Sequence, residues 1–413
     1  MSRGLGLIAE GALDEEGASL DTLAERLGLG GRQLRRLFRQ HLGASPIAVA
    51  QTRRVLFAKQ LLHETRLSMA EIALAAGFGS VRRFNETFQA IFHRPPSALR
   101  RGADAALREG SLAATGVTVR LRYRAPYDWP AMLAHLRARA IEGVERVDAD
   151  RYARTVAHDG ETGTVDIAHA PELLSLVATI RCPSVRALPA IVARIRRVFD
   201  LDADVTAIGA HLASDPFLAP LLARRPGLRV PCAWDGFELC ARAVLGQQVT
   251  LEAGRKLVRQ LARTCGTTVP AMEGGDPALT LMFPGAAEVA RADLGALGVP
   301  AARRRTLIAL AKASLADPRL FQPRDTVEDT VARLRAIRGV GEWTAQYIAL
   351  RAACEPDAFP SNDVALQRGA ATADGTRPSA AELLARAQRW RPWRAYAAQH
   401  LWAAAAARAG GPS

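Results

Sequence analysis

Cysteine is scarce in this sequence of 413 residues, and long apolar runs are absent from it. The five cysteines are scattered without a CxxC pair, at Cys182, Cys232, Cys240, Cys265 and Cys354. This spacing predicts a reduced, cytoplasmic protein without a zinc site, a disulfide framework or an iron–sulfur cluster. No run approaches the ~18 apolar residues of a membrane span, and no signal peptide precedes a cleavage site. Neither a metal nor another cofactor is expected.

Positive charge is in excess. The sequence holds 55 Lys and Arg against 41 Asp and Glu, for a formal net charge of +14 and a pI near 10.6. Such a balance indicates a polyanionic partner, either nucleic acid or an anionic membrane surface, or it reflects the arginine-rich composition of a GC-rich genome. A hydrophobic content of 49% with 23% charged residues is typical of globular proteins. The length favours two to four domains.

The first hundred residues contain one pattern twice. Residues 21–38 and 69–88 each predict a short amphipathic helix, a glycine-containing turn and a second helix. Gly28 and Gly77 stand where the first helix must end, a position that favours φ > 0. The second helices should expose Arg32, Gln33, Arg35, Arg36, Arg82 and Arg83. An arginine-rich face can be merely solvated, but two such helices after glycine turns are typical of recognition helices in a DNA major groove.

The remainder of the chain changes character twice. Residues 102–116 lose their periodicity and are interpreted as a linker. Alternating runs then predict strands at 117–123, 152–156, 164–168 and 173–180. Helices capped by Asp128 and covering 188–199 would complete a small α+β unit, and past Pro231 strands disappear in favour of helices.

These patterns predict a multidomain, mainly α protein. An all-α double helix-turn-helix domain is expected at 1–103, a small α+β domain at 117–228 and an all-α domain at 229–413.

Residues 334–345, LRAIRGVGEWTA, predict a helix, a Gly-Val-Gly hairpin and the start of a second helix. Gly339 and Gly341 would let the backbone approach a ligand, and Val340 and Thr344 complete the pattern. The unpaired N–H groups of the second helix would suit one DNA phosphate, held without regard to base. The alternative is a simple turn between two helices.

Asp363 stands about twenty residues farther on, at the start of an apolar helical run. Read locally, it is most simply an N-cap carboxylate. Aromatic residues also gather in this part of the chain, at Trp343, Tyr347, Trp390, Trp393, Tyr396 and Trp402. A carboxylate beside clustered aromatics can form a stacking pocket for a base, although Trp390 and Trp393 can equally belong to the core.

The hairpin followed by Asp363 resembles the helix-hairpin-helix DNA glycosylases. The motifs WDGFE at 234–238, AVLGQQV at 243–249 and RPWR at 391–394 are similar to the bacterial 3-methyladenine DNA glycosylase II group, over about residues 117–410. Residues 20–101 resemble the paired helix-turn-helix domain of AraC-type regulators. The combination is similar to adaptive-response proteins that join a regulator and a repair activity.

The resemblance implies a monofunctional glycosylase that removes alkylated purines, such as 3-methyladenine and 7-methylguanine, from double-stranded DNA. By position, Asp363 is the implied catalytic carboxylate, and Gln248 the residue that fills the gap left by the flipped base. The implied base pocket consists of Trp343, Tyr347, Trp402 and His135. Trp343 stands where lyase relatives carry a Schiff-base lysine, which implies simple hydrolysis. An aromatic pocket would favour cationic bases by cation–π attraction.

Several features depart from the resemblance. Gln248 replaces an apolar wedge, and Val364 and His135 differ from the aromatic and apolar residues expected at their positions. No cysteine precedes Cys182, so the zinc-cysteine sensor of adaptive-response proteins is missing, or Met1 is a late start. The expected protein is a nucleoid-associated monomer that binds alkylated DNA and promoter DNA. The alternative is a transcription regulator whose glycosylase half is an inert DNA-binding platform.

Overall fold

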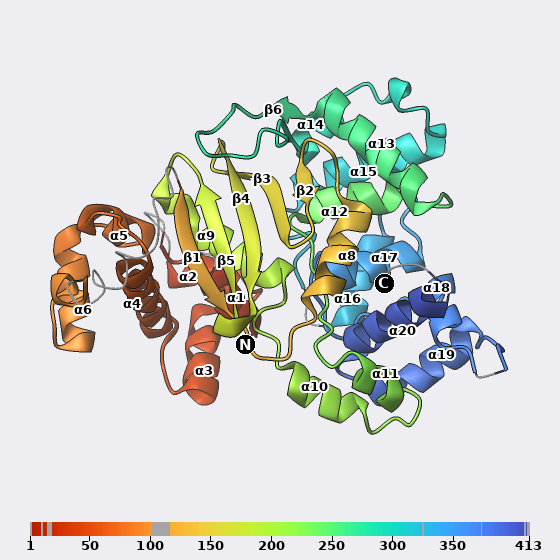
Figure 1. Ribbon diagram of the computed structural model, residues 1–413, viewed down its shortest axis with the longest axis horizontal. Helices are drawn as coiled ribbons and strands as arrows, with labels where there is room; N and C mark the ends of the chain where they lie inside the picture. The colour runs from red at the N-terminus through yellow and green to blue at the C-terminus, as the bar shows by residue number, and fades with distance from the viewer. Residues whose placement is uncertain are drawn as a thin grey trace.

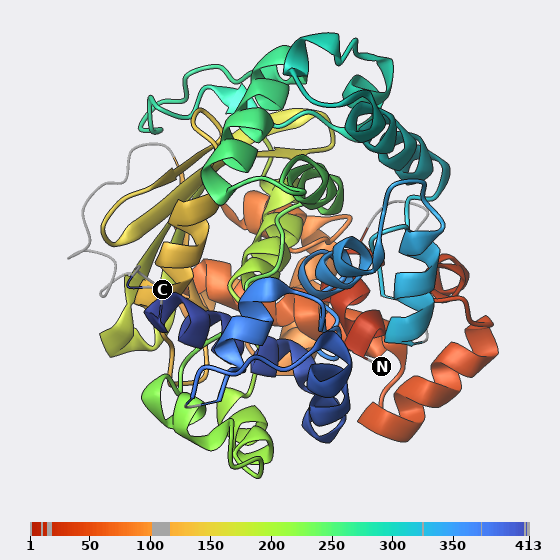
Figure 2. The same cartoon turned by 90° about the vertical axis from the view of Figure 1, so that its right-hand side faces the viewer.

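The computed structural model describes residues 2–9, 11–14, 19–100, 116–323, 326–372, 374–408 and 410. A β-sheet stands between a group of N-terminal helices and a larger C-terminal group of helices (Figure 1), and Figure 2 shows the C-terminal group from its outer side. The predicted mainly α architecture is confirmed. The predicted linker lies outside the described residues except for Gly116. Within the described ranges, no helix has both the length and the apolar composition needed to cross a bilayer.

The N-terminal helices form the predicted repeat. They are α1 (Ser2–Ala9), α2 (Leu20–Arg26), α3 (Gly31–Leu42), α4 (Pro46–Glu64), α5 (Met69–Ala75) and α6 (Val81–Phe92). The pairs α2–α3 and α5–α6 are the two helix-turn-helix units, and α4 joins them. Gly28 and Gly77 end the first helix of each unit with φ of +70° and +81°, the left-handed conformation expected there.

Five antiparallel strands form the sheet, in the order β1-β5-β4-β3-β2. Their bounds are β1 (Val117–Arg122), β2 (Glu145–Val147), β3 (Arg151–His158), β4 (Glu161–Ala170) and β5 (Ser175–Arg181). The four predicted strands are confirmed, and β2 was missed because three residues are too short to show an alternation. Two helices accompany the sheet, α8 (Trp129–Arg139) and α9 (Leu188–Val198). Asp128 caps α8 as expected, accepting the N–H of Ala131 at 3.0 Å.

Helix α4 covers the open side of β1, which is the first strand in the sheet order. The Gln60 amide donates to the carbonyl oxygen of Arg120 at 2.8 Å, and the Glu64 carboxylate accepts the Arg120 N–H at 2.8 Å. Val55 and Leu62 of α4 belong to one buried apolar cluster with residues of the sheet. The N-terminal helices are therefore packed on the sheet rather than held only by a linker.

The C-terminal part of the chain is helical. Its helices are α10 (Val205–Leu212), α11 (Ala219–Arg224), α12 (Gly236–Leu245), α13 (Leu251–Cys265), α14 (Ala286–Arg291), α15 (Ala301–Ala316), α16 (Val327–Arg335), α17 (Glu342–Arg351), α18 (Val364–Gly369), α19 (Ala380–Ala387) and α20 (Arg394–Arg408). The helices α10 and α11 bury Ile208, Leu212 and Leu222 in the same apolar core as the later helices.

Two short strands correct the prediction that strands disappear after Pro231. They are β6 (Thr267–Thr268) and β7 (Leu281–Met282), which pair antiparallel. The Thr155 hydroxyl on β3 donates to the carbonyl of Leu281 at 2.8 Å, so this pair is attached to the main sheet. Strands of two residues carry no sequence periodicity, and it is the neighbouring sheet that positions them.

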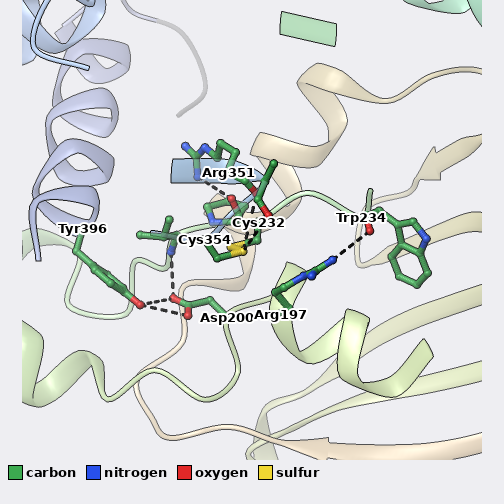
Figure 3. Close-up of a disulfide and its surroundings, with 10 residues drawn as sticks. Arg197, Asp200, Cys232, Trp234, Arg351, Cys354 and Tyr396 are labelled. Carbon is green, nitrogen blue, oxygen red and sulfur yellow. Dashed lines mark hydrogen bonds between the residues drawn. A yellow bond between two sulfur atoms is a disulfide. The ribbon is translucent and has the colours of Figure 1, made fainter. Parts of the chain in front are cut away.

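A disulfide between Cys232 and Cys354 corrects the prediction that this protein has none (Figure 3). The two residues are 122 positions apart, and their Cα atoms lie 5.9 Å from each other. Arg351 belongs to the same junction, since its guanidinium donates to the carbonyl of Pro231 at 2.9 Å and its own carbonyl accepts the N–H of Ala233. Pairing across such a separation leaves no spacing signal in the sequence.

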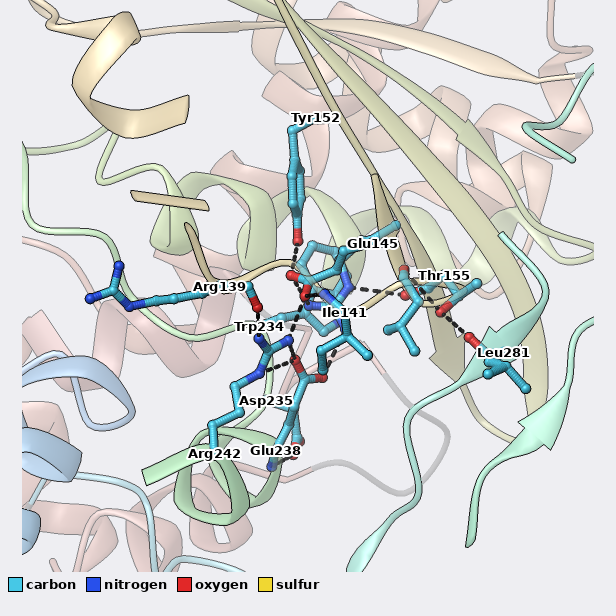
Figure 4. A network of polar contacts seen from close by, with 12 residues as sticks. Arg139, Ile141, Glu145, Tyr152, Thr155, Trp234, Asp235, Glu238, Arg242 and Leu281 are labelled. Atoms are coloured by element: carbon cyan, nitrogen blue, oxygen red, sulfur yellow. Dashed lines mark hydrogen bonds and ion pairs between the residues drawn. The ribbon is translucent and has the colours of Figure 1, made fainter. Parts of the chain in front are cut away.

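A buried ionic network joins the sheet to α12 (Figure 4). The Glu238 carboxylate on α12 binds Arg154 of β3 at 2.8 Å and Arg242 at 2.5 Å. Arg242 also binds Glu145 of β2 at 2.6 Å, and Glu145 accepts the hydroxyl of Tyr152 at 2.7 Å. Burial alone would raise the pKa of Glu238, but the guanidiniums of Arg154 and Arg242 outweigh it and lower that pKa to about 2.

Replacing Glu238 by glutamine should destabilise the protein strongly, because two buried guanidiniums would then share one carboxylate. Breaking a buried pair costs about 3–5 kcal/mol of unfolding free energy, which urea denaturation would measure. Glu252→Gln is the matched control, since Glu252 pairs with Lys256 and both side chains are more than 60% exposed. Equal effects of the two substitutions would contradict the structural role of the network.

The stability difference between the wild type and Glu238→Gln should depend on pH. The folded-state pKa of Glu238, about 2, lies below the ordinary value of 4.5, so its stabilising contribution is fully present above that ordinary value. The contribution is lost as the pH falls toward 2. The difference in stability between the wild type and Glu238→Gln should therefore shrink across that window.

Candidate functional site

Asp363 lies immediately before α18 and receives three N–H donors. Its Oδ1 accepts the backbone N–H of Leu366 at 2.8 Å, which is the helix cap that the local sequence predicts. The same carboxylate accepts the indole N–H of Trp343 on Oδ2 at 2.7 Å and that of Trp402 on Oδ1 at 3.2 Å. The capping role and a place in an aromatic pocket therefore coexist in one residue.

Three of the six clustered aromatic side chains reach this pocket. Trp343 and Tyr347, one turn apart on α17, stack with ring centroids 5.1 Å apart and an interplanar angle of 8°. Trp402 of α20 meets Tyr347 nearly edge-on, at 6.5 Å. Trp390 is fully buried in the core and donates its indole N–H to Asp215 at 2.8 Å. The alternative of core packing is thus confirmed for Trp390.

The pocket is a cavity of about 620 Å³, within the usual range for small-ligand sites. Asp363, His135 and the three aromatic side chains line it together. The helices α8, α12, α13, α17, α18 and α20 contribute its walls. The structure therefore brings together every residue that the sequence assigned to the pocket.

Arginines that the sequence analysis did not assign also line the pocket, namely Arg139, Arg242, Arg255, Arg351 and Arg368. The positive charges of Arg139 and Arg351 act on the hydroxyl of Tyr347. Burial would raise the pKa of Tyr347, but these positive charges outweigh it and lower the pKa below its usual value.

The predicted hairpin connects α16 to α17. Gly339 has φ of +89°, and a Cβ atom on it would lie 1.9 Å from the hydroxyl oxygen of Thr306, so the approach of α15 requires glycine there. Gly341 is exposed and has open space where a Cβ atom would be. Val340 is buried in the core. The exposed glycines and the N-terminus of α17 leave a backbone surface suited to a phosphate.

The side chain of Thr344 is buried and accepts an N–H of the Gln247 side-chain amide at 3.1 Å. The backbone carbonyl of Gln247 in turn accepts an N–H of the Arg303 guanidinium at 2.6 Å. These contacts tie the loop after α12 to the hairpin. Gln248, on the same loop, is exposed and has a left-handed φ of +55°.

Comparison with known proteins agrees with this geometry. The AlkA N-terminal domain profile matches residues 118–235, and a helix-turn-helix domain profile matches residues 23–102. A probable bifunctional transcriptional activator/DNA repair enzyme AlkA from Mycobacterium tuberculosis is 39% identical over 97% of this chain and 79% of its own length. The chain belongs to the AlkA family.

Further relatives match the glycosylase part of the chain. The DNA-3-methyladenine glycosylase 2 of Escherichia coli is 34% identical over 68% of this chain and 95% of its own. The solved 3-methyladenine DNA glycosylase of Archaeoglobus fulgidus has a TM-score of 0.60 at 18% identity, covering 69% of this chain and 97% of its own, which shows the shared fold. This AlkA-family chain thus combines a glycosylase with an AraC-type DNA-binding domain.

The helix-turn-helix units expose the residues assigned to DNA. Arg32, Gln33, Arg35 and Arg36 on α3 and Arg82 and Arg83 on α6 are all solvent-exposed. On the opposite faces, Leu34, Phe38, Phe84 and Phe88 are buried. Arg82 pairs with Glu86 at 2.8 Å, an exposed contact that a DNA phosphate can replace at little cost.

The hairpin prediction is best tested at Gly341, because a side chain at Gly339 would displace α15 and confuse the result. Gly341→Val should weaken binding to duplexes of any sequence, since backbone contacts to phosphate carry no base information. A titration of undamaged duplex at fixed salt measures this. Gly209→Ala on α10 is the control, since Gly209 also has open space around it. Unchanged affinity of Gly341→Val would make the hairpin a simple turn.

Proposed function

We propose that this protein hydrolyses the N-glycosidic bond of alkylated purines, such as 3-methyladenine and 7-methylguanine, in double-stranded DNA. The observation that carries the proposal is the Asp363 carboxylate, held by the two indoles of Trp343 and Trp402 against an aromatic cavity. The reaction is the first step of base excision repair.

The chemistry needs few groups. Methylation at a ring nitrogen gives the purine a positive charge, so the base leaves readily with the electron pair of the C1′–N bond. Asp363 stabilises the positive charge that develops on the sugar, and a water molecule attacks C1′ and passes its proton to the carboxylate. The two indole donors orient the carboxylate without neutralising it.

We infer that the reaction stops at base removal. Strand cleavage by this class of chemistry needs an amine that can form a Schiff base at C1′. Trp343 occupies the position of that lysine by resemblance, and no lysine lines the pocket among the described residues.

The N-terminal helix-turn-helix domain is proposed to bind DNA, including promoter DNA, through the second helices of its two units. Two units in one chain can meet successive major-groove faces about one helical turn apart, so the protein can act as a monomer. A cytoplasmic location on the nucleoid follows from that role. The alternative, a regulator with an inert glycosylase half, would leave the orientation of Asp363 without a purpose.

Asp363→Asn should retain the fold and DNA binding but lose excision by at least about a hundredfold, as removal of a transition-state electrostatic partner does. Asparagine still caps α18 through its carbonyl oxygen. Single-turnover release of methylated bases from duplex DNA measures the rate. Asp204→Asn is the matched control, because Asp204 caps α10 in the same way at 3.1 Å and does not line the pocket. A near-wild-type rate for Asp363→Asn would refute the catalytic assignment, and a wild type without release would favour the regulator.

Borohydride added during turnover should trap no covalent protein–DNA adduct, and the abasic strand should remain intact. The physical reason is the absence of a pocket lysine among the described residues. A gel that resolves protein–DNA adducts provides the measurement, with a known lyase as the positive control. A trapped species would show that another amine performs lyase chemistry.

A further inference from the structure

A second cavity, of about 260 Å³, lies on the sheet and shares no lining residue with the pocket at Asp363. Residues of β2, β3, β4 and β5 line it, together with residues of the segment 274–279 between β6 and β7. Sites for drug-sized ligands usually measure about 300–1,000 Å³, so this cavity suits a more compact ligand.

The register of β4 and β5 brings the polar groups of this cavity together. Thr164 lies directly opposite Arg181, and Asp166 follows two residues after Thr164. Because side chains alternate along a strand, all three lie on one face of the sheet. Ile167 and Ile180 alternate with them and belong to the apolar core on the other face. The cavity therefore contains a hydroxyl, a guanidinium and a carboxylate side by side.

Two of these groups have polar atoms without a partner. The hydroxyl of Thr164 and the Nε of Arg181 are buried, and neither has a hydrogen-bond partner within the described ranges. Thr164 as a whole is only 4% exposed. Buried polar atoms are nearly always hydrogen-bonded in folded proteins, because an unbonded one keeps its full desolvation penalty. Two such donors on neighbouring strands, facing one cavity, indicate a ligand that accepts hydrogen bonds.

The charge of Arg181 is available to such a ligand. The other two arginines of the cavity are held by carboxylates, since Arg146 binds Asp276 at 3.0 Å and Arg151 binds Asp166 at 3.4 Å. Arg181 forms no ion pair with any residue that the structure describes. An anion that entered the cavity would thus meet a guanidinium that no carboxylate contacts.

We propose that this cavity binds a small phosphate that carries its own proton, with inorganic phosphate as the simplest such ligand. Its oxygens accept hydrogen bonds from the guanidinium of Arg181 and the hydroxyl of Thr164, a charge-assisted arrangement that suits arginine. The cavity is too small for a duplex, so the ligand is a free ion or a small ester.

Asp166 selects among oxyanions. An ionised carboxylate can only accept hydrogen bonds, so it repels an anion that has no proton to donate. Inorganic phosphate at pH 7 keeps at least one P–O–H group, which donates to Asp166, whereas sulfate has none. The site should therefore prefer phosphate to sulfate, although the two ions are similar in size and shape.

Calorimetric titration of the full chain at fixed ionic strength tests this preference. The wild type should show one saturable site for inorganic phosphate, and sulfate should bind at least about tenfold more weakly, as expected for the loss of one hydrogen bond to a charged group. Ribose 5-phosphate distinguishes the possible sources of the ligand. Tighter binding than inorganic phosphate would identify phosphomonoesters, and weaker binding would identify the free ion.

Substitutions locate the site. Arg181→Gln should weaken phosphate binding at least about tenfold, because it removes the charged donor. Arg122→Gln is the matched control, since Arg122 is an exposed arginine of β1 that does not line the cavity, and it should bind as the wild type does. Asp166→Asn should reduce the preference for phosphate over sulfate to less than about threefold, because an amide can donate to either ion.

Thr164→Val gives a second readout. It keeps the shape of the side chain and removes only the hydroxyl, so it should weaken phosphate binding by about threefold or more. Its stability in urea should not fall, because the hydroxyl bonds to no described residue. A loss of stability would show that the hydroxyl serves the fold and not a ligand.

Four other results would overturn the inference. The first is a wild type without saturable phosphate binding, and the second is equal affinity for sulfate. The third is unchanged affinity in Arg181→Gln, together with loss of binding in Gly341→Val, which would place the phosphate at the hairpin. The fourth is weaker binding of undamaged duplex by Arg181→Gln, which would make Arg181 a DNA contact.

Discussion

Arg242 connects the sheet, α12 and the end of α8, and the relative placement of these elements shapes the pocket. Its guanidinium binds Glu145 on β2 and Glu238 on its own helix, and it also donates to the carbonyl of Arg139 at the end of α8. One charged group thereby fixes the sheet, the central helix α12 and the helix that carries His135. Because Arg242 also lines the pocket, the ionic network that joins the sheet to α12 extends to the pocket. Burial of so many charges is tolerated only because each has a partner of opposite sign or a carbonyl oxygen.

Asp363 combines a common structural role with a place in the pocket. A helix cap needs one carboxylate oxygen and a backbone N–H, and leaves the second oxygen free. Here the second oxygen meets the indole of Trp343, and Trp402 approaches the first. The cap fixes the carboxylate relative to α18, while the indoles fix the aromatic walls relative to the carboxylate. The geometry of the site therefore depends on an ordinary helix end.

The sequence predicts well the strands and turns that depend on local residue patterns. Alternation identified β1, β3, β4 and β5, and the glycines at 28 and 77 marked the turns of the two N-terminal units. The hairpin and Asp363 were recognisable because glycine and a carboxylate occur at a characteristic distance. Elements without periodicity were missed, as the two-residue strands β6 and β7 illustrate.

Features built by long-range packing could not be predicted from the sequence. The arginines of the pocket come from α8, α12, α13, α17 and α18, and no local signal shows that they converge. Cys232 and Cys354 pair across 122 positions for the same reason. The buried position of Thr344 depends on Gln247, which lies in a different loop. Each of these facts requires the relative placement of helices, which the side-chain pattern of one helix does not contain.

The covering of β1 by α4 has a consequence for solubility. A strand at the end of a sheet presents unpaired N–H and carbonyl groups, which invite a strand of another molecule to add to it and so lead to aggregation. Gln60 and Glu64 occupy both backbone groups of Arg120, and the bulk of α4 blocks the approach of a second chain. The helix-turn-helix domain thus also covers the edge of the sheet. Its packing there protects the α+β domain, which contributes α8 to the pocket, from aggregation.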